Sequence, residues 1–333
     1  MKELFTALAQ SVRCGVSAVL CTVTESQGST PRGPGAMMAV FPGGRIAGTV
    51  GGGRVEYECI QRALHVLDEG ADALERYVLT PNQVADLGMI CGGNQSVYFR
   101  FAAGGDGEAA ALFERAAALF REQSDSWLFT RLRPGGQAEC DLFTQGAFLF
   151  GRFPAPDEGA LPRLSPRLAD GVLIQPLSRS ETVYVFGGGH VSQALVPLLA
   201  ALDFPVVVYD ERPEFTDPAL FPAALRTVCA PYPALLEHID PKPNDYAVVM
   251  TRGHEGDYAV QRSLLTRPMR YIGVIGSRRK AALQRQRLLD EGFSDEQLAV
   301  VHSPVGLPIG AQTPAEIAVS VAAELIKLRS ENG

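Results

Sequence analysis

The sequence predicts an α/β protein that combines an N-terminal mixed α/β domain with a C-terminal Rossmann-like domain, a doubly wound parallel sheet. Two observations support this fold class. In the first hundred residues, short apolar runs are separated by turns rich in glycine and proline, a pattern typical of an antiparallel meander. Beyond residue 181, strand-like runs without polar alternation alternate with helical segments, which is typical of parallel strands buried on both faces.

The N-terminal half is expected to combine several strands with three helices. Its first residues, MKELFTALAQSVRCG, have the spacing of a short amphipathic helix. The segment Arg54–Glu69 has apolar residues at helical spacing and stops at Gly70, and another helix is expected at Glu108–Arg121. Strands are expected at Val16–Glu25, Gly35–Pro42, Arg45–Val50, Leu74–Leu79 and Ser96–Phe101, with further strand-like pieces up to about Phe153.

Composition shifts divide the chain. We expect an N-terminal domain over residues 1–155, a linker rich in proline and glycine over 156–180, a Rossmann-like domain over 181–312 and a C-terminal helix over 313–333. That helix is apolar along one face, so it returns to the N-terminal domain or buries against a second subunit. A homodimer is the expectation.

Composition also limits the partners. The net charge of −7 without a basic block argues against nucleic acid, and no apolar run is long enough to span a membrane, so a cytoplasmic protein is expected. The cysteines form no CxxC pair or His–Cys cluster, which argues against a disulfide framework or a zinc site. They are Cys14, Cys21, Cys59, Cys91, Cys140 and Cys229.

The stretch VYVFGGGHVSQAL resembles a dinucleotide fingerprint. Gly187 and Gly189 fit its first two glycines, between a predicted strand and a predicted helix, and Ser192 stands where the third glycine is usual. Asp210 ends the next strand, where an acidic side chain can accept from a ribose hydroxyl. The alternative is a glycine turn that only lets helix and sheet pack.

Two histidines and one cysteine are candidates for chemistry. His254 in TRGHEGD follows a strand's carboxyl end, and His190 lies in the glycine turn; either can act as an acid–base group or merely position a ligand. Cys91 lies in LGMICGG beside two glycines, Gly92 and Gly93, which allow close backbone approach. Its thiol is either presented to a ligand or buried as a small hydrophobic group.

Together these segments resemble the XdhC/CoxI family of accessory proteins that mature molybdenum hydroxylases such as xanthine dehydrogenase. The N-terminal half contributes GSTPRGPGAMMAV, GTVGGGRVEYE and LGMICGG. The C-terminal half contributes FGGGHVSQAL, YDERPEF, TRGHEGD and the tail from IGSRRKAALQRQRL to Ile326. The similarity covers nearly the whole chain, and its motifs are numerous and ordered.

The resemblance implies a chaperone that binds the molybdenum cofactor, protects it during sulfuration and hands it to a xanthine dehydrogenase-type hydroxylase, rather than a turnover enzyme. A phosphate or pyrophosphate of the cofactor suits glycine-rich helix N-termini, and arginines can fork onto its oxygens. A cysteine desulfurase is a further candidate partner. The cofactor-binding residues expected are Arg32, Gly51, Gly52, Gly53, Arg54, Glu56, Gly92, Gly93, Gly187, Gly188, Gly189, His190, Asp210, Ser277 and Arg278.

Two departures from the family affect the thiol chemistry. Some relatives have cysteine at the position of Gly53, and others have consecutive cysteines where this chain has Ile90 and Cys91. A mechanism that needs a thiol pair in the N-terminal domain is therefore in doubt for this chain. Cys91 remains as the candidate molybdenum ligand, because a thiolate is a soft donor suited to a thiophilic metal.

Three functions from different classes compete. The first is the cofactor chaperone, with a site lined by the glycine turns at 51–53, 91–93 and 187–190 and the turn around Ser277. The second is an NAD(P)-dependent oxidoreductase, supported by Gly187, Gly189 and Asp210 but without a clear acid–base constellation. The third is a sulfurtransferase in which Cys91 carries a persulfide. A nicotinamide titration and mass spectrometry after incubation with a cysteine desulfurase discriminate the last two from the first.

Overall fold

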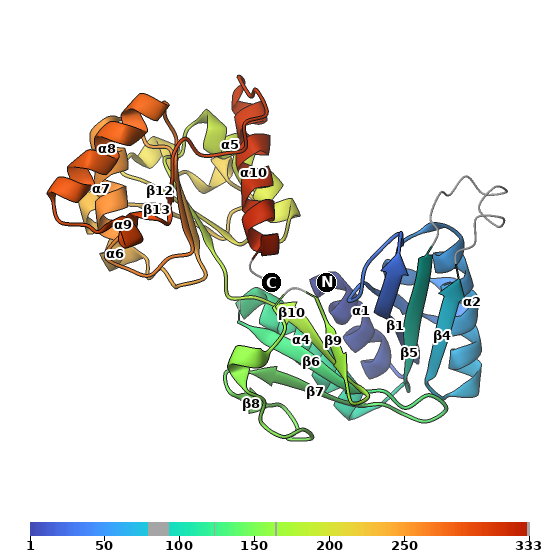
Figure 1. The fold of residues 1–333 in the computed structure, drawn as a ribbon. Helices are drawn as coiled ribbons and strands as arrows, with labels where there is room; N and C mark the ends of the chain where they lie inside the picture. Colours follow the sequence, from blue (N-terminus) through green and yellow to red (C-terminus); the bar gives the residue numbers. More distant parts are fainter. Residues whose placement is uncertain (79–92, 123, 164, 332–333) are drawn as a thin grey trace. The chain divides into compact units, whose positions relative to one another are not determined.

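The structure, a computed structural model, describes residues 1–78, 93–122, 124–163 and 165–331. The chain divides into two compact units, Met1–Arg179 and a second unit that begins at Ser180 (Figure 1). The described strands form two sheets in the first unit and one in the second. This arrangement confirms the predicted fold class, a mixed α/β half followed by a Rossmann-like half.

The first sheet contains the predicted meander. β1 pairs antiparallel with β2, β2 with β3, and the other edge of β1 with β5. The ladder between β1 and β5 ends at the pair Gly28 and Gly93. In spatial order the strands are β3 (Ile46–Gly48), β2 (Met37–Val40), β1 (Ala18–Gly28), β5 (Gly93–Ala102) and β4 (Ala73–Val78).

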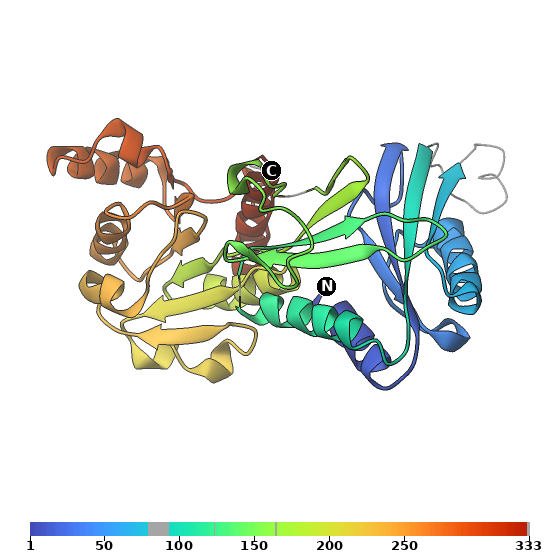
Figure 2. The same cartoon turned by 90° about the horizontal axis from the view of Figure 1, so that it is seen from below.

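Alternate side chains of β1 face two different helix layers, as the twofold period of a strand requires. Val19 and Cys21 pack against α2, whereas Ala18 and Leu20 face α1 and α4, which contact each other. Figure 2 shows α2 apart from α1 and α4 across this sheet. The helices are α1 (Lys2–Arg13), α2 (Gly53–Glu69) and α4 (Gly107–Glu122).

A second antiparallel sheet completes the first unit. One of its faces, with Leu128 and Leu142, joins the core around α1 and α4, and the other face carries a cluster of phenylalanines. In spatial order its strands are β8 (Ala147–Phe148), β7 (Glu139–Thr144), β6 (Ser126–Arg131), β10 (Val172–Ser178) and β9 (Arg167–Ala169). The two sheets thus share one hydrophobic core.

Residues 156–180 differ from the predicted linker, because β9 and β10 lie within them and belong to this sheet. The first unit therefore extends to Arg179 rather than to residue 155. Proline obscured these strands in the sequence. Pro176 is tolerated because it lies beyond Val172–Ile174, the part of β10 that pairs with β9, so its missing N–H breaks no bond to that neighbour.

The second unit has a sheet in which every neighbouring strand pair is parallel. In spatial order the strands are β13 (Arg226–Cys229), β12 (Val206–Asp210), β11 (Val183–Phe186), β14 (Tyr246–Val249), β15 (Tyr271–Val274) and β16 (Val301–His302). The central strands are buried throughout, as the absence of polar alternation predicted.

Helices cover both faces of this sheet (Figure 1). On one face, Val185 and Val208 pack with α5 and α10; on the other, Phe186 and Val249 pack with α6, α7, α8 and α9. The helices are α5 (His190–Ala201), α6 (Leu235–His238), α7 (His254–Leu264), α8 (Arg278–Asp290), α9 (Asp295–Leu298) and α10 (Pro314–Glu331). The layers are those of a doubly wound fold.

The C-terminal helix α10 packs within the second unit. Its apolar residues Ala318, Val321 and Leu325 are fully buried in the core that α5 shares with the sheet. The sequence left two other locations open for this apolar face, the N-terminal domain and a second subunit. Neither location is needed to bury this apolar face, because α10 packs on the parallel sheet beside α5.

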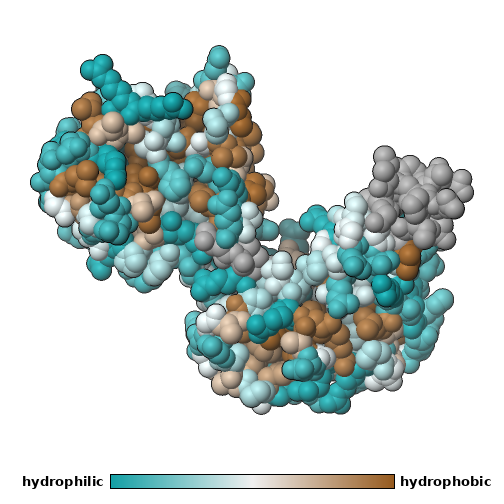
Figure 3. Space-filling model, viewed as in Figure 1, coloured by the Kyte–Doolittle hydropathy of each residue, from teal (hydrophilic) through white to brown (hydrophobic). Residues whose placement is uncertain are grey.

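The molecular surface is mixed in character. On the face seen in Figure 3, hydrophobic and hydrophilic residues are interspersed over both units. Among the helices of the described ranges, none combines the length and the apolar character that crossing a membrane requires.

Candidate functional site

The first candidate site is the glycine turn that leads into α2. Gly51, Gly52 and Gly53 have φ values of 138°, 76° and 62°, where a side chain would be strained. A Cβ on Gly51 would lie 2.7 Å from the Cβ of Pro31, whereas Gly52 has open space around it. The first N–H groups of α2 have no partner within the helix, so this turn has the backbone geometry that can bind an anion.

Glu56 holds the glycine turn in place. Its Oε2 accepts hydrogen bonds from the N–H of Val50 at 3.3 Å, from the N–H of Gly52 at 3.2 Å and from the hydroxyl of Thr49. This oxygen therefore caps local structure, whereas the sequence predicted Glu56 among the cofactor-binding residues. The N–H of Gly51 is also satisfied, by Thr49 Oγ1 at 3.0 Å.

Gln95 joins the turn to the loop that carries Arg32. The side chain is fully buried, and its Nε2 lies 3.3 Å from the carbonyl oxygen of Val50 and 3.5 Å from that of Arg32. Among the residues that the structure describes, its Oε1 has no hydrogen-bond partner. A buried acceptor without a partner is costly, so a ligand N–H placed there would be stabilised. Sequence analysis missed this residue, which lies two positions after the end of LGMICGG.

The remaining candidate site residues of the N-terminal half differ in whether other groups of the chain already contact them. Arg54 pairs with Glu58 at 2.5 Å, whereas Arg32 is exposed and makes no ion pair within the described part of the chain. At Gly93 a Cβ would lie 2.4 Å from the carbonyl oxygen of Gln27, so this glycine permits the close approach of β5 to β1. Cys91 and Gly92 lie outside the described residues.

The second candidate site is the glycine turn between β11 and α5, where the fingerprint predicted a strand–turn–helix. A Cβ on Gly187 would lie 2.2 Å from the carbonyl oxygen of Met250, and one on Gly188 would lie 1.9 Å from that of Phe215. Gly189 is the N-cap residue of α5 and has open space around it, and His190 is the first residue of the helix. Two glycines therefore serve close packing, and the third leaves the helix N-terminus accessible.

This turn lies at the point where the strand order reverses. From β11 the sheet continues through β12 in one direction and through β14 in the other. The helices that follow these adjacent strands begin at His190 after β11 and at His254 after β14. In open α/β sheets ligands bind outside the carboxyl ends of the strands at such a switch point. Both histidines are exposed at helix N-termini there.

Asp210, predicted to accept from a ribose hydroxyl, is fully buried at the end of β12. Its Oδ2 accepts from the N–H of Gly188 at 2.9 Å, and both of its oxygens accept from the guanidinium of Arg212. Burial alone would raise the pKa of the carboxyl, but the hydrogen bonds from Arg212 and Gly188 outweigh it and hold that pKa below its ordinary value. Asp210 thus fixes the glycine turn.

A further buried acid supports the neighbouring turn. Asp257 on α7 accepts from the N–H of Thr251 at 2.9 Å and from its hydroxyl at 2.7 Å, and it forms an ion pair with Lys280 on α8. Ser277, the N-cap of α8, accepts from the N–H of Lys280 at 3.3 Å. Sequence analysis passed over Asp257, although it lies within the TRGHEGD motif.

The N-terminal halves of α7 and α8 border a groove of about 400 Å³. His254 and Ser277 line it together with Arg279 and the exposed side chain of Leu283. The first turn of α8 contains cations and no acidic residue, and Arg278 there is exposed. Ser277 and Arg278, which follow β15, therefore lie at the rim of the same region as His254, two strands away from β11 and its fingerprint turn.

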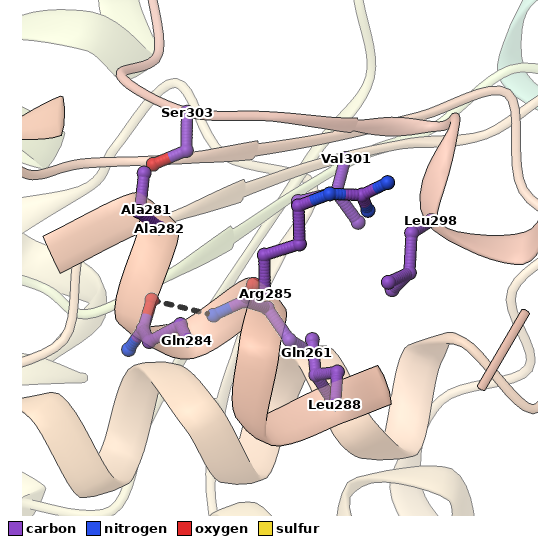
Figure 4. A pocket seen from close by; sticks show the side chains of 9 residues that line it. All are labelled: Gln261, Ala281, Ala282, Gln284, Arg285, Leu288, Leu298, Val301 and Ser303. Atoms are coloured by element: carbon purple, nitrogen blue, oxygen red, sulfur yellow. Dashed lines mark hydrogen bonds between the residues drawn. The ribbon is translucent and has the colours of Figure 1, made fainter. Parts of the chain in front are cut away.

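A smaller cavity of about 140 Å³ lies on the other side of α8 (Figure 4). Gln261 Nε2 donates to Gln284 Oε1 at 3.0 Å in its wall, and Leu288 and Leu298 supply apolar surface. Sites for small molecules measure roughly 300–1,000 Å³, so this cavity is too small to hold a nucleotide. Over the described ranges, no group of three or more His, Cys, Asp or Glu side chains is placed to hold a metal ion.

Comparisons with known proteins agree with both halves of the chain. Residues 11–78 match the model of the XdhC and CoxI family, and residues 183–325 match the XdhC Rossmann domain. A protein of Bacillus subtilis (strain 168) named as a probable xanthine dehydrogenase subunit is 29% identical, with 94% of this chain and 93% of that protein covered. The molybdenum cofactor insertion chaperone PaoD of Escherichia coli (strain K12) is 26% identical, with 96% and 86% covered.

Two other proteins are similar over nearly the whole chain. The uncharacterized protein YqeB of Escherichia coli (strain K12) is 27% identical over 98% of this chain, which spans only 46% of that longer relative. A crystal structure from Bacillus halodurans, described as a xanthine dehydrogenase, superposes with a TM-score of 0.81 at 25% identity and covers 100% of this chain and 96% of that one.

Proposed function

The chain belongs to the XdhC and CoxI family, and from this membership we propose that it binds the molybdenum cofactor, protects it, supports its sulfuration and delivers it to a xanthine dehydrogenase-type hydroxylase. The similarity to a cofactor insertion chaperone and to a probable xanthine dehydrogenase subunit supports this accessory role. A cysteine desulfurase as partner, a homodimer and a cytoplasmic location stay predictions.

The observation that carries the proposal is the buried Oε1 of Gln95 beside the glycine turn of the first unit, which has no hydrogen-bond partner in the described part of the chain. A pterin has ring N–H donors, and one of them would satisfy this buried acceptor. Arg32, exposed in the loop that Gln95 contacts, offers a guanidinium that can fork onto a phosphate. The residues present therefore fit a ligand that combines hydrogen-bonding ring nitrogens with an anion.

The second unit offers a separate surface for anions. The first turns of α5 and α7 point their unpaired N–H groups outward at adjoining strand ends, and the helix dipole favours negative charge at each. Gly189 and Gly253, their N-cap residues, have no side chain to obstruct a ligand. This surface suits a phosphate or pyrophosphate of the cofactor.

The thiol of Cys91 would supply a soft ligand for molybdenum. A sulfur donor can coordinate the metal or lie beside its sulfido ligand, which supports a role in sulfuration. In the sulfurtransferase alternative the same thiol carries a persulfide, and mass spectrometry after treatment with a cysteine desulfurase would detect the added sulfur.

The NAD(P)-dependent oxidoreductase is the other alternative, favoured by the strand–turn–helix at Gly187–His190. Its usual ribose contact is occupied here, because Arg212 pairs with Asp210. A titration with NAD and NADP separates the two functions. Saturable nicotinamide binding with hydride transfer would favour the oxidoreductase over the chaperone.

The test is to purify the chain after co-expression with the molybdenum cofactor pathway and to measure molybdenum and pterin. We expect both to copurify in equal amounts and to transfer to an apo-hydroxylase. Arg32→Ala should lower the content at least tenfold, whereas the control Arg121→Ala, an exposed arginine at the end of α4, should not. Protein that neither retains nor accepts cofactor would contradict the proposal.

A further inference from the structure

A polar groove of about 770 Å³ opens within the first unit, on the face of the first sheet opposite to α2. The ends of β1, β4 and β5 line one side, and the segment that enters β9 lines the other. Its volume lies within the range of roughly 300–1,000 Å³ that is usual for small-molecule sites. None of the residues predicted from the sequence as site residues lines this groove.

Strand register brings the lining side chains together. Arg76 on β4 is opposite Ser96 on β5, and Asn94 on β5 is opposite Gln27 on β1. Residues opposite each other in an antiparallel pair share a face of the sheet, so three strands direct polar side chains to one place. Arg167 reaches the groove from β9.

The two arginines of this groove differ from Arg62, an arginine of α2, in the partners of their guanidinium groups. Arg62, on the α2 side of the sheet, pairs with Glu75 and Glu69. Arg76 is exposed and makes no ion pair within the described ranges. Arg167 donates a hydrogen bond of 2.9 Å from Nη1 to the carbonyl oxygen of Ala160, which leaves its other guanidinium donors available. Two guanidinium groups can therefore fork onto an anion here.

The other lining groups suit a heterocycle and its sugar. The amides of Gln27 and Asn94 each offer a donor and an acceptor, as the edge of a base requires, and Glu25 can accept from hydroxyl groups. Pro34 and Pro166 add apolar surface on which a ring can lie. Anion, base edge, hydroxyls and ring together are the components of a nucleotide.

The groove adjoins the glycine turn through one short segment. Pro31 packs on Gly51, and Pro34, three residues later, lines the groove. The next residue, Gly35, is fixed by a hydrogen bond of 2.8 Å from Gln175 Nε2 to its carbonyl oxygen and by close contact with Pro166. A ligand seated at the turn can therefore continue into the groove around this segment.

We propose that this groove binds the nucleotide end of the dinucleotide form of the molybdenum cofactor, with Arg76 and Arg167 on its phosphate and Gln27 and Asn94 on its base. This inference rests on the proposed function and names the cofactor form that the chain carries. The molybdopterin form of the cofactor, which ends in a phosphate, lacks the base and sugar for which the groove has partners.

The test uses the purified full-length chain and isothermal titration with CMP, GMP and inorganic phosphate. We expect one nucleotide site per chain, with CMP or GMP binding at least tenfold more tightly than phosphate. The double variant Arg76→Ala/Arg167→Ala should weaken nucleotide binding at least tenfold, because both guanidinium groups are lost. Arg121→Ala is the matched control, and unfolding curves verify that each variant folds.

Nucleotide affinity that is unchanged in the double variant, or no better than that of phosphate, would overturn the groove assignment. Cofactor content after co-expression separates this failure from failure of the proposed function. If wild type and double variant retain the dinucleotide cofactor equally, the assignment fails and the chaperone function stands. If nucleotides bind through Arg76 but the chain retains neither molybdenum nor pterin, the nucleotide site stands and the chaperone function fails.

Discussion

Asp210 and Arg212 form a two-point ion pair at the end of β12, with Arg212 Nε 2.9 Å from Oδ1 and Nη2 2.8 Å from Oδ2. The carboxylate also accepts from the N–H of Gly188. The pair therefore ties the end of one strand to the glycine turn that follows its neighbour, β11. A ribose hydroxyl would reach Asp210 only after Arg212 had moved away.

Asp210→Asn should destabilise the second unit. Removing one partner of a buried ion pair costs roughly 3–5 kcal/mol, and we expect about 3 kcal/mol because the Arg212 side chain is 23% exposed. Unfolding followed by circular dichroism at pH 7 measures the loss. A variant as stable as wild type would show that the ion pair makes no net contribution to the free energy of unfolding.

The contribution of Asp210 to the stability of the second unit should also depend on pH. Its pKa is lower in the folded protein than the value of about 3.9 for an unfolded chain, so the ionised carboxylate stabilises the fold. That contribution is complete above about pH 5 and is lost as pH falls through the folded pKa. The stability difference between wild type and Asp210→Asn should therefore shrink from pH 5 to pH 3. A difference that stays constant over this range would contradict the assignment.

Gly188 and Gly189 should respond differently to alanine. A Cβ on Gly188 would lie 1.9 Å from a backbone oxygen that cannot easily move, so Gly188→Ala should cost about 1–3 kcal/mol. Gly189 has a φ of −71° and open space, and Gly189→Ala should cost under about 1 kcal/mol, as expected for an N-cap glycine. Thermal unfolding of the two variants side by side tests this order, and equal losses would contradict it.

Glu56→Ala should loosen the glycine turn of the first unit. The carboxylate accepts from two backbone N–H groups and the Thr49 hydroxyl, and charged hydrogen bonds contribute roughly 1.5–3 kcal/mol. The fluorescence of Trp127, the one tryptophan of the chain, reports unfolding of this unit. Glu58→Ala, which removes only the exposed pair with Arg54, is the matched control and should cost about 0.3–0.5 kcal/mol.

The cysteines should differ widely in their reactivity toward an alkylating reagent. Burial raises the pKa of the Cys59 thiol to about 12 and raises the pKa of the Cys21 thiol well above its ordinary value, so both should react only on unfolding. Cys14 and Cys229 are exposed and should react readily. In a Cys14→Ser/Cys229→Ser background, we predict that Cys91 reacts faster than Cys21 or Cys59.

Binding of the cofactor should then protect Cys91 from the reagent, since its thiol is predicted to face the metal. Cys91→Ser replaces a soft donor by a hard one, and cofactor retention should fall by more than the tenfold that corresponds to about 1.4 kcal/mol. Mass spectrometry of tryptic peptides measures the modification. Full retention by Cys91→Ser, or a thiol that reacts only after unfolding, would leave Cys91 a packing residue.

The sequence alone determined the features that depend on local chemistry. Apolar runs without polar alternation predicted the strands of the parallel sheet, because a strand covered by helices on both faces has no solvent-facing position. The period of Arg54–Glu69 and the stop at Gly70 predicted α2, whose C-cap is that glycine in the left-handed region. The glycine turn at residues 187–189 was predicted because these glycines lie between a predicted strand and a predicted helix.

Tertiary structure decided which polar groups meet. Gln95 is 45 residues from Val50 and 63 from Arg32 in sequence, and only the pairing of β5 with β1 brings its amide to both carbonyl oxygens. The groove around Arg76 likewise needs strands from three separate segments. The proline in β10 kept this strand from being predicted from the sequence. Pro176 is tolerated because the neighbouring strand β9 pairs only with Val172–Ile174, and this pairing is visible only in the folded sheet. Periodicity reports burial along one segment, whereas a site depends on long-range pairing that fixes distances between segments.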